Sequence, residues 1–265
     1  GDHILSWPLI DLLKPVAEAG FGELEIWQYH ISRLHRQELD ALRERLDELR
    51  LGSVAIGGYP KFHLTGGEGE AMEAELDRLV EYGVVLGVDL FKIFPGSLGS
   101  EKLDEAQREL SVNRILRLAE QLAMRDIVLT METHGNTLCD TLESTLRLLE
   151  ELSACGDRVG ICFQPYIEHD TDQAIATFDA LDGRVRHLHL QNRREGGTTL
   201  LEEGDWTDYS RFLPHVRERG FGGPLSLEFT DGITPAEGES FDLRRVIDNA
   251  ARDRDFACRA WDGAA

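Results

Sequence analysis

The chain has 265 residues, of which 42% are hydrophobic and 29% charged, so it can bury a large core and does not have the composition of a disordered protein. Acidic residues outnumber basic ones by 49 to 28, and the formal net charge of −21 opposes binding to nucleic-acid phosphates. The sequence contains no apolar run of about 20 residues that could span a bilayer, no basic secretory leader and no CxxC pair among its four cysteines. We therefore expect a cytoplasmic protein with no membrane or nucleic-acid partner.

Strand-like and helix-like segments alternate along the whole chain. In order, they are strand 3–7, helix 9–19, strand 23–27, helix 37–50, strand 51–57, helix 69–83, strand 88–94, helix 101–124, strand 127–132, helix 142–152, strand 159–163, helix 172–181, strand 185–190, helix 209–219, strand 224–229 and helix 242–261. Apolar strands between amphipathic helices indicate a parallel sheet that is buried on both faces. Eight such pairs predict an α/β protein, a (β/α)8 TIM barrel formed by residues 1–265 as one domain. A doubly wound sheet would need a glycine-rich phosphate loop after the first strand, and the sequence has none there.

Polar side chains gather at the ends of the predicted strands, which is where barrels of this type carry their chemistry. Glu132, Gln164, His189 and Glu228 come from four consecutive strands at equivalent heights. Strands spaced about 4.8 Å apart around a closed barrel would aim these side chains at one point. Two carboxylates, one imidazole and one amide oxygen suit a divalent cation such as Mn, Mg, Co or Zn. Any one of them could be structural, for example Glu228 in an ion pair with Lys92, but four together favour a functional cluster.

Five motifs carry a resemblance to a known family. They are AGFGELEIW at residues 19–27, METHGNTLCDT at 131–141, HLHLQN at 187–192, EGDW at 203–206 and GFGGPLSLE at 220–228. With these motifs the sequence resembles the sugar isomerase/epimerase group of xylose-isomerase-like barrels, which also includes DNA-repair enzymes of the endonuclease IV type. The resemblance covers nearly the whole chain. It implies a metal held by Glu132, the residue ending the sixth strand, His189 and Glu228, with the two glutamates also moving a substrate proton.

The sequence departs from the family pattern at two strands. The sixth strand usually ends in Asp with His three residues later, and this chain has Gln164 and Ile167 there. The common His-x-Lys-Asp of the seventh strand is replaced by His189 followed by Gln191 and Asn192. A glutamine can ligate through its carbonyl oxygen but brings no charge, so the predicted site has two negative charges instead of three. This keeps open the alternative of a non-catalytic barrel whose metal site has degenerated.

The leading functional hypothesis is a metal-dependent isomerase or epimerase acting on a small carbohydrate or a hydroxy-keto acid. Glu132 and Glu228 would act as acid and base through an enediolate. Candidates for binding the substrate are His134, Lys92, His63, Arg193 and Trp27.

A dehydratase of a sugar-like acid is the main alternative, because the same enolate can expel a β-hydroxyl group. Endonuclease activity is disfavoured, since it needs more His and Asp ligands and a basic groove. The family resemblance also implies a homo-oligomer. The long loop 191–205 is expected to move over the site as a lid.

Overall fold

The computed structural model describes residues 7–167, 169–181, 183–235 and 240–264. One parallel sheet runs in the order β1-β2-β3-β4-β5-β6-β9. Its strands are β1 (Glu23–Trp27), β2 (Gly52–Gly58), β3 (Leu90–Ile93), β4 (Val128–Glu132), β5 (Val159–Phe163), β6 (Val185–Leu190) and β9 (Leu225–Leu227). The strand expected at residues 3–7 lies, apart from Trp7, outside the described residues.

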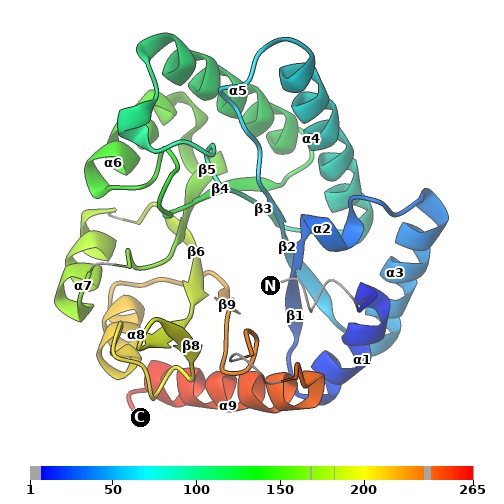
Figure 1. Cartoon of the computed structure of the whole chain (residues 1–265), viewed down its shortest axis with the longest axis vertical. Helices are drawn as coiled ribbons and strands as arrows, with labels where there is room; N and C mark the ends of the chain where they lie inside the picture. The colour runs from blue at the N-terminus through cyan, green and yellow to red at the C-terminus, as the bar shows by residue number, and fades with distance from the viewer. Residues whose placement is uncertain (1–6, 168, 182, 236–239, 265) are drawn as a thin grey trace.

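The helices surround this sheet as an outer ring (Figure 1). They are α1 (Leu9–Glu18), α2 (Gln28–Ile31), α3 (Arg36–Leu49), α4 (Gly66–Leu86), α5 (Glu105–Ala123), α6 (Leu142–Glu151), α7 (Thr171–Ala180), α8 (Tyr209–Glu218) and α9 (Leu243–Trp261), with short 3-10 turns at Ser100–Lys102 and Ser153–Arg158. The chain is therefore an α/β TIM barrel, which confirms the fold predicted from the alternating segments.

Side chains of opposite character occupy the two faces of the sheet. Residues that point outward from the strands, such as Leu129, Met131 and Leu188, belong to the main apolar core that the helices cover. At one end of the barrel interior a smaller apolar cluster forms around Ala55 and Leu90. Two residues further along β3 and β4 the inward side chains are the polar Lys92 and Thr130, because successive residues of a strand alternate between faces. The polar positions therefore lie at the carboxyl ends of the strands, as expected.

Local capping explains where the predicted helix boundaries shift. The helix expected at 101–124 begins at Glu105, since Asp104 accepts a hydrogen bond from the Gln107 amide and Gln107 accepts one from the Asp104 amide. The helix expected at 69–83 extends to Leu86, where Gly87 adopts a φ of 69° and ends it.

The loop between β6 and α8 is a packed hairpin. Strands β7 (Asn192–Arg194) and β8 (Gly197–Thr199) pair in antiparallel fashion. The buried Asn192 amide donates to the carbonyl oxygens of Leu201 and Thr207, each at 2.8 Å. These bonds fix the base of the loop, and its movement over the site stays a prediction for the exposed tip at residues 194–197.

Asp253 of α9 ties this hairpin to the segment that follows β9. Its carboxylate accepts from the Leu201 amide at 2.7 Å and from the Thr230 hydroxyl at 2.5 Å, and the side chain is buried. Asp253→Ala leaves the Leu201 amide and the Thr230 hydroxyl without their partner, so we expect a loss of about 1–3 kcal/mol in the free energy of unfolding at about pH 4, where no buried negative charge offsets it. Urea denaturation measures it.

The same residue predicts a pH dependence. Burial raises the pKa of Asp253 to about 6, against the opposing effect of its two hydrogen bonds. The folded state then holds the proton more tightly than the unfolded state, so the contribution of Asp253 to stability falls as pH rises from about 4 to about 6. Asp253→Asn should remove this part of the pH profile; an unchanged profile would show that the carboxyl does not titrate in that window.

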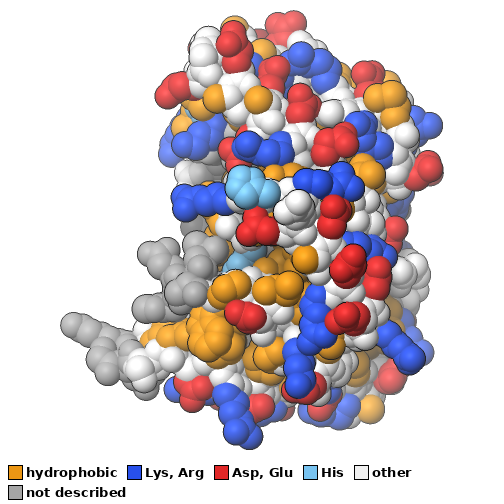
Figure 2. Space-filling view, turned by 90° about the vertical axis from the view of Figure 1, so that its right-hand side faces the viewer, with side chains coloured by type: hydrophobic (Ala, Val, Ile, Leu, Met, Phe, Trp, Pro, Cys, Tyr) orange, Lys and Arg blue, Asp and Glu red, His pale blue; other side chains and the backbone are white. Residues whose placement is uncertain are grey.

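The outer face of the barrel is strongly charged but mixed in sign. Figure 2 shows acidic and basic side chains interspersed over the side of the molecule that carries α3 and α4. On α3, Arg36 pairs with Asp40 and Arg43 with Asp47 one turn along the helix. Within the described residues, no helix combines the length and apolar character needed to cross a membrane.

Candidate metal and proton-transfer site

Three predicted site residues converge where β4, β6 and β9 end. Nδ1 of His189 lies 3.7 Å from Oε1 of Glu132 and 3.6 Å from Oε2 of Glu228. One ligand atom from each of the three residues lies within 4.8 Å of the others. Glu228 is placed by its backbone amide, which donates to the Leu190 carbonyl of β6 at 3.0 Å. This arrangement is the one that the strand-end pattern predicted, and we call it the outer site.

Two polar atoms of the outer site are left without a partner. Oε1 of Glu132 and Nδ1 of His189 are buried and form no hydrogen bond among the described residues. A buried polar atom without a partner costs about 1–3 kcal/mol, so such atoms in a folded protein point to a ligand. Both atoms are good ligands for a divalent cation and face the same point, so the residues present fit a metal.

Glu25 and Lys92 hold Glu132 and His189 in place from inside the barrel. Lys92 Nζ lies 2.6 Å from Oε2 of Glu132 and 3.6 Å from Oε1 of Glu25. The other oxygen of Glu25 lies 2.7 Å from Nε2 of His189 and thereby fixes the imidazole with its Nδ1 toward the outer site. Gly57 makes room for this ion pair, because a Cβ there would come within 3.2 Å of Lys92 and 3.3 Å of Glu25.

The charges of the site are strongly coupled. Burial alone would raise the pKa of Glu25, but His189 and Lys92 outweigh it and hold that pKa below its usual range. Burial would lower the pKa of Lys92, yet Glu132 and Glu25 keep it well above its usual value. The pKa of His189 is likewise raised, because Cys162 and the surrounding carboxylates outweigh its burial. Three carboxylates thus share one lysine and one histidine, which favours an added cation.

Gln164 and Gln191 close the site on the β5 side. Gln164 follows β5, and its backbone is fixed by the Thr133 hydroxyl, which donates to the Gln164 carbonyl and accepts from its amide. The side-chain amide of Gln191 donates to Oε1 of Gln164 at 2.8 Å and to Oε2 of Glu228 at 2.7 Å. Gln191 therefore bridges two of the four predicted ligands.

The remaining substrate-binding candidates divide into four groups. Lys92 is buried in the ion pair described above. Arg193 reaches the site, since its guanidinium donates to Oε1 of Gln191 at 3.3 Å. His134 and Trp27 belong to an aromatic wall along the ends of β1 to β4, which also includes Tyr59 and Phe94, with His134 stacked on Phe94 at 4.4 Å between ring centroids.

The fourth group is His63 alone. No hydrogen bond, ion pair or ring contact joins it to the cluster in the described part of the chain.

Glu25 and Gln191 are the functional candidates that sequence reasoning passed over. Glu25 is an acidic residue in the middle of β1, on the same face as Glu23 and Trp27, and this was the available signal. Gln191 stands two residues after His189, so both point to the same side of the chain as it leaves β6. A residue that holds a ligand is harder to detect than the ligand itself, because its role depends on a partner from a distant strand.

Comparison with known proteins confirms the fold and the family resemblance. A family model described as xylose isomerase-like TIM barrel matches residues 13–250. A curated relative, the 3-dehydroshikimate dehydratase of Bacillus anthracis, is 28% identical over 185 residues, which are 69% of this chain and 65% of the relative. The matched region thus spans a little less than two thirds of that relative's length.

Solved structures also share the architecture. A D-psicose 3-epimerase from Clostridium cellulolyticum H10, solved with D-tagatose, has a TM-score of 0.77 at 15% identity, covering 96% of this chain and 94% of that one. A xylose isomerase-like TIM barrel protein from Mycobacterium smegmatis in complex with magnesium has a TM-score of 0.71 at 17% identity, covering 99% and 92%. With the family model matching most of its length, this chain belongs to the xylose isomerase-like TIM barrel family.

Proposed function

We propose that this protein is a metal-dependent lyase that dehydrates a cyclic hydroxy-keto acid of the 3-dehydroshikimate type. The observation that carries the proposal is the convergence of Glu132, His189 and Glu228, with two of their buried polar atoms unpartnered among the described residues. Proton removal next to a carbonyl needs a base and a cation at one point, and this cluster offers both. The sequence similarity to a dehydratase of that substrate supports the choice of reaction.

The metal would be held by Glu132, His189 and Glu228, with the carbonyl oxygen of Gln164 as a neutral fourth ligand. When bound, it would polarise the substrate carbonyl and so acidify the neighbouring C–H bond. This donor set suits Mg, Mn, Co or Zn. Because Gln164 stands in place of a carboxylate, the site has one negative charge fewer with which to hold the cation.

Glu228 is the better candidate for the base. Its side chain is 22% exposed, whereas that of Glu132 is fully buried with one oxygen held by Lys92. Glu228 therefore faces an incoming substrate and can accept its proton. Gln191 holds the Glu228 carboxylate in place by donating to Oε2. Glu132 is held by Lys92 at 2.6 Å and serves as a fixed ligand.

Arg193 favours an acidic substrate over a neutral sugar. Its Nε is buried and has no hydrogen-bond partner among the described residues, while its guanidinium lies over the Trp206 ring at 5.8 Å. A guanidinium held in this way matches a carboxylate with two parallel hydrogen bonds. We infer that Arg193 binds the carboxylate of the substrate at the mouth of the barrel.

Epimerisation or isomerisation of a keto-sugar is the second candidate. The aromatic wall of Trp27, Tyr59 and Phe94 favours it, because sugar C–H faces stack well on aromatic rings. Both reactions begin with the same proton removal. They differ in the fate of the enolate, which either loses a β-hydroxyl group or regains a proton on its other face.

The test is incubation of the purified protein with Mg or Mn and a panel of 3-dehydroshikimate, an inosose and free keto-sugars, with analysis of the products. Dehydration of 3-dehydroshikimate to an aromatic dihydroxybenzoate supports the proposal. Conversion of a keto-sugar to its epimer instead supports the second candidate. Absence of both turnover and bound metal would favour a barrel that has lost its metal.

Replacing Arg193 tests the substrate class. Arg193→Met keeps the length of the side chain but removes the charge-assisted hydrogen bonds, each of which contributes about 1.5–3 kcal/mol. We expect KM for the acid to rise about tenfold or more, with a smaller change in kcat. Arg194→Met, the exposed neighbour on the same hairpin, is the control. Equal kinetics for the two variants would remove Arg193 from the substrate site.

A further inference from the structure

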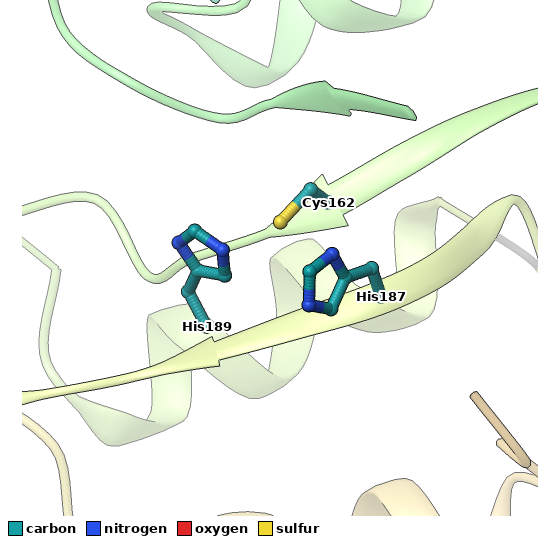
Figure 3. Close-up of side chains that lie close together, drawn as sticks. All are labelled: Cys162, His187 and His189. Atoms are coloured by element: carbon teal, nitrogen blue, oxygen red, sulfur yellow. The ribbon is translucent and has the colours of Figure 1, made fainter. Parts of the chain in front are cut away.

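Below the outer site lies a second group of metal-ligating side chains, which we call the inner cluster. It consists of Cys162 from β5 and His187 and His189 from β6, all of them buried. The register pairs Cys162 with His187 across the two strands, and His189 follows on the same face. One ligand atom from each residue lies within 4.8 Å of the others. Figure 3 shows a ring nitrogen of each histidine turned toward the Cys162 sulfur.

The hydrogen bonds of the inner cluster leave a ligand position open. Nε2 of His187 is bonded to the Ser226 hydroxyl at 2.7 Å, while its Nδ1 is buried with no partner among the described residues. Neither the metal nor the proton transfer of the proposed function uses Cys162 or His187. A fully buried ring nitrogen without a partner is costly, so a ligand at this position would be stabilising.

The donor set differs in character from that of the outer site. The outer site offers mainly oxygen atoms, which suit Mg and Mn, whereas a thiolate with imidazoles suits zinc and other thiophilic cations. Glu25 lies beside this cluster and accepts from Nε2 of His189 at 2.7 Å, but it approaches His187 on the Nε2 side, away from the unpartnered Nδ1. Bonds of about 2.0–2.3 Å to a tetrahedral zinc place ligand atoms roughly 3.3–3.8 Å apart, so small side-chain rotations would close this cluster around an ion.

We propose that Cys162, His187 and His189 form a second metal site that takes a thiophilic divalent cation such as Zn²⁺ or Cd²⁺. Binding releases two protons to solvent, one from the Cys162 thiol and one from the Nε2 of His189 that is bonded to Glu25, and forms a metal–thiolate bond with no change of oxidation state. His189 presents Nδ1 to the outer site and Nε2 to the inner one, so its ring links the two. The inference does not depend on the reaction proposed above.

Cd²⁺ titration tests this site, because a cadmium–thiolate bond absorbs in the ultraviolet. Cys155→Ser/Cys258→Ser provides the background, since these two cysteines are the less buried ones and would bind cadmium on their own. Saturating Mg²⁺ occupies the outer site during the titration. We expect one equivalent of Cd²⁺ to produce the thiolate band.

Cys162→Ser and Cys139→Ser, added separately to this background, form a matched pair, because both cysteines are buried and only Cys162 faces the histidines. The band should disappear in Cys162→Ser and persist in Cys139→Ser. Absence of the band in the folded background protein, or its persistence in Cys162→Ser, would overturn the proposal.

A third variant covers loss of folding. His187→Gln keeps the thiol but removes the unpartnered Nδ1, so the Cd²⁺ affinity should fall while circular dichroism stays unchanged. Glu228→Ala should lose Mn²⁺ binding at the outer site, monitored by electron paramagnetic resonance, and keep the cadmium band. If Glu228→Ala abolished the band and His187→Gln did not weaken it, cadmium would be bound at the outer site and the inner site would be wrong.

Discussion

Glu228→Gln is expected to lower kcat for dehydration of 3-dehydroshikimate by about 10²–10⁴-fold, the range that a positioned general base contributes. The substitution keeps the size of the side chain and an acceptor oxygen for Gln191, which lies 2.7 Å from Oε2 of Glu228. It removes the negative charge and the ability to accept a proton. The measurement is steady-state turnover at saturating substrate and metal, with the bound metal quantified by mass spectrometry in the same sample.

Two further variants make this result specific to Glu228. Glu228→Asp restores a carboxylate that is one carbon shorter and should recover part of the rate. Glu23→Gln removes an exposed carboxylate at the start of β1, at the other end of the strand from the outer site. It should leave kcat within about twofold, as surface changes generally do. A Glu228→Gln protein with full metal content and an unchanged kcat would eliminate Glu228 as the proton acceptor.

The fold was predictable from the sequence because its signal is repeated. Each apolar strand with its amphipathic helix says little alone, but the alternation continues along the chain and only a few architectures satisfy it. Boundaries shifted where capping decides them, as at Asp104, where a side chain competes for backbone amides. Movement of the loop after β6 as a lid stays a prediction, but the β7–β8 hairpin within that loop was not predicted. Its packing comes from the bonds of Asn192 to Leu201 and Thr207, which composition does not reveal.

The outer site was predictable for a different reason. In a parallel barrel the strand ends lie at one rim, so Glu132, His189 and Glu228 had to approach one another once the strands were placed. What the pattern could not supply was the partner of each group. The sequence allows Lys92 as a partner of Glu228 or as a substrate ligand, but β3 pairs directly with β4, and this places Lys92 beside Glu132. Glu25 comes from the other flank of β2, and its contact with His189 crosses the barrel interior.

Lys92→Met should reduce the free energy of unfolding of the metal-free protein by about 3–5 kcal/mol, as expected when one partner of a buried ion pair is removed. Lys92 and Glu132 are both almost fully buried, and Nζ lies 2.6 Å from Oε2. Without the ammonium group, Glu132 has no cation within reach except His189 in the described part of the chain. Methionine fills nearly the same volume, so the loss reports charge more than packing.

Two control proteins separate loss of the ion pair from the effect of replacing a lysine with methionine. Lys102→Met, at an exposed lysine, should cost less than about 0.5 kcal/mol. The double variant Lys92→Met/Glu132→Gln should be more stable than Lys92→Met alone, because it no longer buries an uncompensated carboxylate. Urea denaturation of the four proteins gives these values.

The metal dependence of the same series connects stability to the site. A divalent cation bound at Glu132 supplies positive charge close to where Lys92 supplied it, so Mg²⁺ or Mn²⁺ should stabilise Lys92→Met more than it stabilises the wild type, and should not do so in the double variant. If Lys92→Met costs less than about 1 kcal/mol with or without metal, Glu132 is not a buried carboxylate anion. A neutral Glu132 could not hold a cation tightly beside His189 and Glu228. This measurement of stability therefore also tests whether Glu132 can serve as a metal ligand in the proposed reaction.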